Sequence, residues 1–198
     1  MKQYKLELAM VLGLACAIFA GSTAVFARDC AQIQQDVVRL HILANSDSEE
    51  DQRLKLTVRD AILERTGDIF GQPQTQAQAK EVAREHLCLV EQIARETLEA
   101  QGCNLPVRAQ VVNMFFETRR YDGFDLPAGR YDAIRVTIGA GAGRNWWCVV
   151  FPPMCITAAQ PAGSAEIAQE ILALRETPIY EPKLAIVEWY RTWQEQNP

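Results

Sequence analysis

The chain contains few of the residues on which metal sites and common catalytic sites depend. It has only two histidines, and its six cysteines form no Cys-x-x-Cys motif and no Cys/His pair at zinc spacing. No Gly-Lys-Ser or Gly-Lys-Thr occurs, so the P-loop is absent, and the dinucleotide-binding fingerprint is absent too. The sequence therefore gives no reason to expect a metal ion, another cofactor or a small-molecule substrate.

The chain also lacks an excess of positive charge. Its formal net charge is −5 at pH 7, and an acidic balance argues against binding to nucleic acid or adhesion to anionic lipid. After residue 27 there is no second long apolar run, no internal repeat and no low-complexity tail. The remaining chain of about 170 residues has the length of a single domain.

Charged residues are absent from Leu8 to Phe26, and Lys2 and Lys5 form a short positive region before this run. That order is typical of a secretory signal, and the run is also long enough to span a bilayer. Small residues around Ala27 would permit cleavage, so a cleaved signal peptide and an uncleaved anchor both remain open. We therefore predict three parts: 1–27 as signal peptide or membrane anchor, 28–35 as a short linker, and 36–198 as one exported domain.

Hydrophobic periodicity predicts an α+β domain. Residues 38–44 alternate as a strand does, and Ser48 with Asp51 resembles a capping box for a helix that runs to about Arg65. Further elements are expected as a helix over about 75–100, strands over 107–118, 131–138 and 146–151, and helical segments over 163–174 and 184–193. The order β-α-α-β-β-β-α-α predicts a mainly antiparallel sheet of about four strands covered by helices, after an N-terminal apolar export helix.

Five cysteines lie in the predicted exported part, an odd number that leaves at least one without a partner in the same chain. Pro152-Pro153 cannot continue a central strand, and a reversal there would make Cys148 and Cys155 equidistant from the turn. Residues that face each other in an antiparallel pair lie within disulfide range. We therefore predict a Cys148–Cys155 disulfide, while the pairing of the others stays open: Cys30, Cys88 and Cys103.

The most polar segment follows the first predicted strand. His41 shares a strand face with Arg39 and leads into Asn45, Ser46 and Asp47. These residues are too close in sequence for the usual geometry of a Ser/His/Asp site. A polar network through Asp47, Asp51 and Arg59, which would join the strand to the first helix, is the favoured interpretation.

The glycine-rich stretch Gly139–Gly143 is the most conspicuous loop. A phosphate site would need a helix after it, but a β-rich run follows, so a hairpin loop is the better interpretation. Trp146 and Trp147 come next, and adjacent strand residues point to opposite faces. We expect Trp147 in the core, which leaves Trp146 to be covered by another element or to contact a partner.

Several blocks of the sequence closely resemble signatures of the stage II sporulation protein R family. The first block is RLHILANSDS, from Arg39 to Ser48, continued by Glu50-Asp51-Gln52 and Leu54-Lys55. Another is LPAGRY, from Leu126 to Tyr131, and a third runs from Ile138 to Cys155 with NWWCVVFPPMC at its end. The resemblance extends from about Val37 to Trp193.

The resemblance implies a developmental signal in an endospore-forming bacterium. Members of this family are made in the forespore and exported into the space between the two septal membranes. There they trigger a membrane-embedded aspartic protease of the mother cell, which removes the pro-sequence of sigma-E. By this resemblance the chain is a secreted or tethered activator rather than an enzyme, its partner is that protease, and residues 8–26 contact the membrane if they are not removed.

The candidate partner surface combines the polar run, the glycine loop and Trp146. Its residues are Arg39, His41, Asn45, Asp47, Asp51, Gly141, Asn145 and Trp146. One alternative is that these signatures serve folding alone. Another is a cell-envelope enzyme, such as a cell-wall hydrolase, that uses Asp47, His41 and a carboxylate from elsewhere in the chain.

Overall fold

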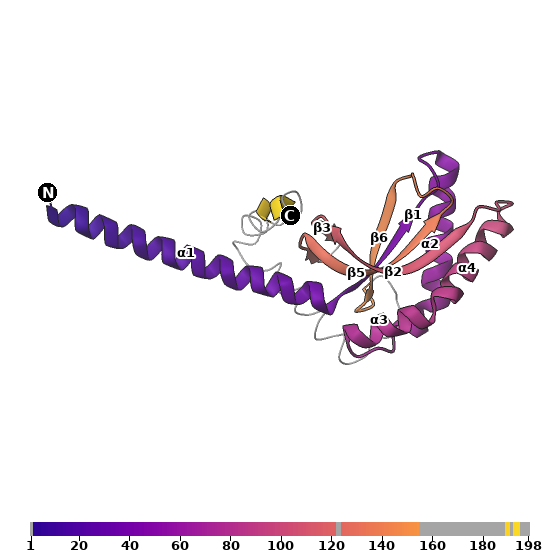
Figure 1. The fold of residues 1–198 in the computed structure, drawn as a ribbon, viewed down its shortest axis with the longest axis horizontal. Coiled ribbons are helices and arrows are strands. Elements are labelled where there is room, and N and C mark those ends of the chain that lie inside the picture. Colours follow the sequence, from indigo (N-terminus) through magenta and orange to yellow (C-terminus); the bar gives the residue numbers. More distant parts are fainter. Residues whose placement is uncertain (1, 122–123, 155–188, 191, 195–198) are drawn as a thin grey trace.

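The computed structural model describes residues 2–121, 124–154, 189–190 and 192–194. A long N-terminal helix leads into a four-stranded sheet, and helices cover one face of that sheet (Figure 1). The predicted α+β class is confirmed. The predicted helical segment 163–174 and most of 184–193 lie outside the described residues.

The helices and strands follow the predicted order over the described part of the chain except for a break in the second predicted helix and an added pair of strands. They are α1 (Lys2–Asp36), β1 (Val38–Leu43), α2 (Glu49–Phe70), α3 (Gln76–Glu85), α4 (Leu87–Ala100), β2 (Val107–Phe116), β3 (Arg119–Tyr121), β4 (Phe124–Leu126), β5 (Gly129–Ile138) and β6 (Asn145–Phe151). The short pair β3 and β4 forms a separate two-stranded sheet that the sequence did not predict. The other strands end within a few residues of their predicted bounds, and α2 extends to Phe70 rather than ending near Arg65.

The main sheet is mixed, with the order β2-β5-β1-β6. β1 runs antiparallel to β6 and β2 runs antiparallel to β5, as expected, but β1 and β5 are parallel. Parallel neighbours need a long crossover connection. The chain between β1 and β5 contains all three covering helices, so it supplies that connection.

One face of the sheet and the helices α2–α4 enclose the main core. Strand residues that alternate along β1, such as Leu40 and Ile42, meet the apolar stripe of α2, including Leu54 and Val58. At the start of α2, the Ser48 hydroxyl accepts a hydrogen bond from the backbone N–H of Asp51 at 3.1 Å. This is half of a capping box and fixes where the helix begins.

The predicted long helix over 75–100 is two helices, α3 and α4, separated at His86. His86 has φ −104° and ψ 11°, outside the helical range, and its Nδ1 lies 2.8 Å from the carbonyl oxygen of Val82. Ala83 and Val90 are both buried although the break lies between them. They are two helical turns apart, so the apolar stripe stays in step and hydrophobic spacing does not reveal the break.

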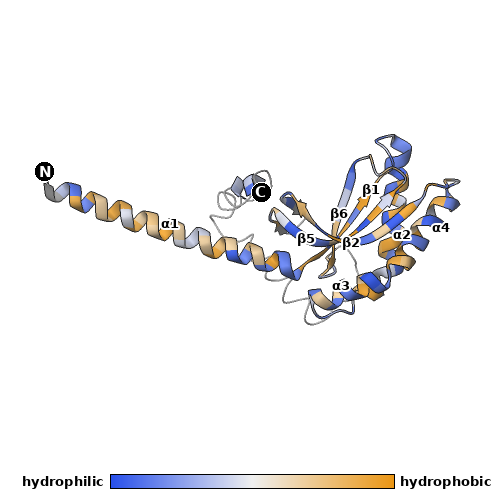
Figure 2. Ribbon diagram, viewed as in Figure 1, coloured by the Kyte–Doolittle hydropathy of each residue, from blue (hydrophilic) through white to orange (hydrophobic). Residues whose placement is uncertain are grey.

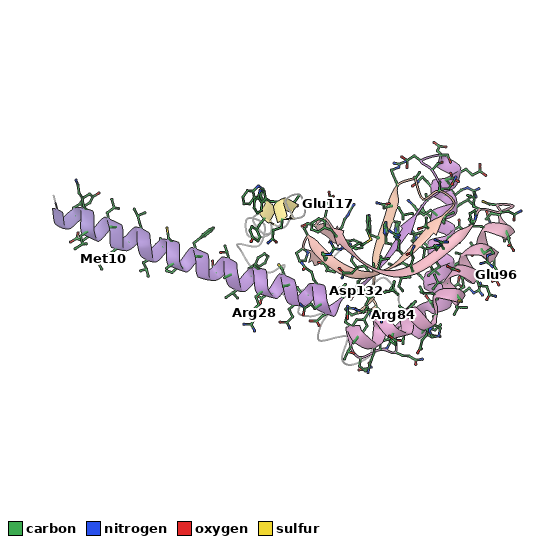
Figure 3. All side chains as sticks on the ribbon, in the orientation of Figure 1. Met10, Arg28, Arg84, Glu96, Glu117 and Asp132 are labelled. Atoms are coloured by element: carbon green, nitrogen blue, oxygen red, sulfur yellow. The ribbon has the colours of Figure 1, made fainter. Side chains whose placement is uncertain are left out.

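Most of α1 stands away from the domain. Its apolar part has the length and composition to cross a membrane, and its side chains, such as Met10, project without neighbours (Figures 2 and 3). Exposing this much apolar surface of a helix to water would be unfavourable. The helix therefore fits export or membrane tethering.

The last turns of α1 belong to the domain. Ile33 is buried beside Tyr131 and Leu126, and the Gln34 amide donates to the carbonyl oxygen of Ala128 at 2.9 Å. Residues 28–35, for which a linker is predicted, are thus helical and partly buried. The connection between the apolar segment and the sheet is a continuous helix rather than an extended chain.

Only one cysteine of the predicted disulfide lies within the described residues. Cys148 is buried and disulfide-bonded, whereas Cys16, Cys88 and Cys103 are free thiols. Cys155, the predicted partner, lies outside the described residues. We expect a Cys148–Cys155 cross-linked peptide when exported, non-reduced protein is alkylated, digested and analysed by mass spectrometry. Alkylation of Cys155 without prior reduction would contradict the pairing.

Candidate functional site

The polar run after β1 packs against the glycine-rich loop between β5 and β6. We call these two segments, residues 44–51 and 139–144, the loop junction. The backbone N–H of Ala142 donates to the Asn45 carbonyl oxygen at 3.2 Å, and the N–H of Ala140 donates to Asn45 Oδ1 at 2.9 Å. Asn45 therefore fixes the position of the glycine loop through both its backbone and its side chain.

Asp51 accepts hydrogen bonds from two side chains of the polar run. Its Oδ2 accepts from Asn45 Nδ2 at 2.9 Å and from Ser46 Oγ at 2.5 Å. These donors, Ser46 first, hold the pKa of Asp51 below its usual value. The charged carboxylate thus ties the loop after β1 to the first turn of α2, where a negative charge is also favourable.

Lys55 and Asp47 hold the other side of the junction. Lys55 is 5% exposed, and its Nζ donates to Gln52 Oε1 at 2.7 Å and to the Arg144 carbonyl oxygen at 2.9 Å. Burial lowers the pKa of Lys55, and the nearby charge of Arg144 adds to this shift. Asp47 Oδ1 accepts from the Arg144 backbone N–H at 2.7 Å.

Three of the predicted partner-binding residues are thus used within the fold. Asn45 and Asp51 bond to each other, and Gly141 has a φ of +62°, with Thr137 Cγ2 only 2.6 Å from where a Cβ would stand. Asp47 contacts the glycine loop rather than α2, and its side chain remains largely exposed. Arg59 takes no part in the junction and pairs with Asp60 at 2.7 Å instead.

The opposite face of the sheet, which α2–α4 do not cover, is called the open face here. Alternation along paired strands places polar and aromatic side chains on it. They are Arg39 and His41 of β1, Arg108 and Gln110 of β2, Arg135 and Thr137 of β5, and Asn145 and Trp147 of β6.

Aromatic rings enclose Arg39 at one end of the open face. Arg39 is fully buried, with its guanidinium carbon 4.1 Å from the ring centre of Phe116 and 5.1 Å from that of Tyr131. These are cation–π distances. The end of α1 and Leu126 complete the small core around these rings, so Arg39 is inaccessible to a partner in this structure.

His41 lies next along β1 and is 3% exposed. Its ring stacks on Trp147 with centroids 4.0 Å apart and planes 7° from parallel, and neither ring nitrogen has a hydrogen-bond partner among the described residues. Burial lowers the pKa of His41 to about 4; the nearby Asn145 side chain opposes this shift, and the charges of Arg135 and Arg39 add to it. The imidazole is therefore neutral at neutral pH.

Beyond His41 the open face holds a pocket. Its volume is about 400 Å³, and its lining residues are Pro106, Val107, Arg108, Gln110, Arg135, Thr137 and Gly139. The candidate surface predicted from the sequence did not include Arg108, Gln110 or Arg135. The signal was the alternation of these residues with buried apolar ones, but only the strand register places Gln110 opposite Arg135.

The geometry does not assemble the catalytic pair considered from the sequence. His41 faces Trp147 and makes no hydrogen bond to a carboxylate in the described residues, while Asp47 lies at the exposed edge of the loop junction. A triad needs the acid to hold the imidazole. Within the described ranges, no group of three or more His, Cys, Asp or Glu side chains could hold a metal ion.

Trp146 and Trp147 lie on opposite faces of β6, as alternation predicts. Trp146 packs against the main core and lies under Arg59, whose guanidinium carbon is 5.1 Å from its ring centre. Trp147 belongs to the open face and also contacts Phe116, with centroids 4.7 Å apart. The structure thus separates Trp146 from His41, while Asn145, at the start of β6, is exposed on the open face.

Comparison with known proteins now identifies the family of this chain. The model of the family described as stage II sporulation protein R matches residues 34–161, which is more than half of the chain. The stage II sporulation protein R of Bacillus subtilis (strain 168) is 41% identical over 123 residues, which cover 62% of this chain and 55% of that protein. The chain thus spans little more than half the length of the curated relative it matches, and no solved structure matches it. The matched residues contain the loop junction and all the strands of the open face, and the chain belongs to the stage II sporulation protein R family.

Proposed function

We propose that this chain is an exported signalling protein that activates a membrane-embedded aspartic protease of the mother cell. It acts from the space between the two septal membranes, and the protease then processes pro-sigma-E. The observation that carries the proposal is membership of a sporulation family combined with an N-terminal helix suited to export. In this role the chain is a binding protein and not an enzyme.

The continuous helix α1 supports contact with a membrane-embedded partner. Phe26 ends the uncharged segment, and the ten further residues to Asp36 extend the helix by about 15 Å. If α1 stays uncut, the domain is held within that distance of the bilayer surface. If it is cut near Ala27, the turns around Ile33 remain docked on the sheet and the domain is released intact.

Activation requires that the domain bind one state of the protease better than another. A ligand shifts a conformational equilibrium only by its differential affinity for the two states. We place the contact on Asp47 and Asn145, the exposed members of the candidate surface, at the edge of the open face. Asn45, Asp51 and Gly141 shape this surface, because their contacts lie within the fold.

The test is to produce the protease and the sigma-E precursor, with or without this chain, in a bacterium that does not sporulate. Immunoblotting should reveal the shortened sigma factor only when the chain is present, and an active-site variant of the protease should abolish it. Unchanged precursor, with the chain exported and folded, would contradict the proposal. It would favour the envelope enzyme, to be tested on purified cell wall.

A further inference from the structure

The pocket on the open face combines two arginines, and none of its described lining residues is acidic. We propose that it binds carboxylates of an extended acidic segment presented by the partner protein, with Arg108 and Arg135 as the groups that receive them. The identity of the partner rests on the proposed function above. The carboxylate preference rests on the pocket itself.

Arg135 brings a hydrogen-bond donor that needs an acceptor to the pocket. Its Nε is buried and has no hydrogen-bond partner among the described residues, although buried polar groups are almost always paired. Leaving such a donor without an acceptor is costly, and the cost is larger for a charged group. Arg135 lines the pocket, so a carboxylate bound there could supply the missing acceptor after a small rotation of the arginine side chain.

The charges on the open face favour an acidic ligand. No acidic residue stands among the side chains that the described strands β1, β2, β5 and β6 place on the open face. Neither Arg108 nor Arg135 forms an ion pair within the described residues, whereas Arg65, on the helix side, pairs with Glu96 at 2.7 Å. The side chains that the described strands place on the open face therefore carry a net positive charge, on a protein whose net charge is −5.

The spacing of Arg108 and Arg135 favours an extended segment over a single small anion. Arg135 lies opposite Gln110, so Arg108 is its diagonal neighbour on the same face. Diagonal neighbours across an antiparallel pair are about 7 Å apart. Side chains at alternate positions of an extended peptide are also about 7 Å apart on one face. Two acidic residues separated by one residue would thus match the two guanidinium groups, which bind carboxylates bidentately.

The experiment uses the full chain in detergent micelles and a fluorescent peptide with glutamate at every second position. The same peptide with glutamine in place of glutamate is the matched probe. We expect anisotropy to show binding of the glutamate peptide that weakens with added salt, and at least tenfold weaker binding of the glutamine peptide. Arg135→Gln and Arg108→Gln should each weaken binding of the glutamate peptide about tenfold. This is the loss expected for one charge-assisted hydrogen bond.

Control variants keep the result interpretable. Arg84→Gln, on the exposed side of α3 where Arg84 pairs with Glu81, should leave binding unchanged. Arg108 is exposed on an edge strand, so its replacement tests the pocket even if Arg135→Gln unfolds the domain, which circular dichroism would reveal. The proposal would be overturned by equal binding of the two peptides or by unchanged binding in both pocket variants. It would also be overturned if inorganic phosphate displaced the glutamate peptide at concentrations similar to those of the peptide.

The same variants separate this inference from the proposed function. If the wild-type chain drives processing of pro-sigma-E but does not prefer the glutamate peptide, the acidic-segment proposal fails and the proposed function stands. If the wild-type chain binds the peptide but drives no processing, the proposed function fails instead. Loss of peptide binding and of processing in Arg108→Gln, with neither lost in Arg84→Gln, would support both.

Discussion

Replacement of Gly143 by alanine is expected to disrupt the loop junction and to lower the free energy of unfolding by about 3 kcal/mol or more. A Cβ at this position would overlap the carbonyl oxygen of Ser46. That oxygen belongs to the backbone, so it cannot rotate away as the end of a side chain could. Moving the loop instead would stretch the hydrogen bond from Gly143 N to the Ala44 carbonyl oxygen, which is 3.0 Å long.

Urea unfolding, monitored by tryptophan fluorescence, measures this change in the free energy of unfolding. Gly102→Ala is the matched control, because a Cβ there would have no atom within 4 Å although φ is +73°. It carries only the cost of a left-handed backbone, about 1 kcal/mol. Equal losses in the two variants would contradict the claim that close backbone approach fixes Gly143.

Acidification is expected to destabilise the domain through His41 before the carboxylates whose pKa is lowered contribute. The unfolded chain binds a proton there near the ordinary pKa of 6.5, whereas in the folded domain the pKa is lowered to about 4. The stabilising contribution is therefore fully present above pH 6.5 and is lost as the pH falls from 6.5 towards 4. Between about pH 7.5 and about pH 5 this group alone should cost about 2 kcal/mol.

His41→Phe provides the comparison for this prediction. Phenylalanine can retain the stacking on Trp147 but cannot be protonated, so its free energy of unfolding should change much less over the same pH interval. The lowered pKa of Asp51 or of Asp132 acts at more acidic pH, because these contributions are lost only as the pH falls below the ordinary value of 3.8. An equal loss in wild type and variant would mean that His41 does not titrate as its burial implies.

Local signals in the sequence predicted much of the fold. The alternation over residues 38–44 identified β1, and Ser48 with Asp51 identified the start of α2. The parallel pairing of β1 with β5 was not predictable, because it joins Val38 to Asp132 across the whole helical layer. Pairing over such distances depends on packing rather than on local propensity.

The candidate site was predicted only in part, because some of its contacts are local in sequence and others depend on the pairing of distant strands. Asn45 and Asp51 are six positions apart, and their contact follows from a turn that the sequence specifies locally. Arg108 and Arg135 come from strands that meet only in the sheet, so their shared pocket depends on register. A shift of one residue would turn either arginine to the helix side.

The most direct test of the central claim compares the full chain with a variant that lacks residues 8–26, in cells that also produce the protease and the sigma-E precursor. The account predicts a shortened sigma factor with the full chain and none with the deletion variant, although both accumulate and the variant's domain resists proteolysis. Equal processing by the non-exported variant would contradict a signal delivered from outside the membrane.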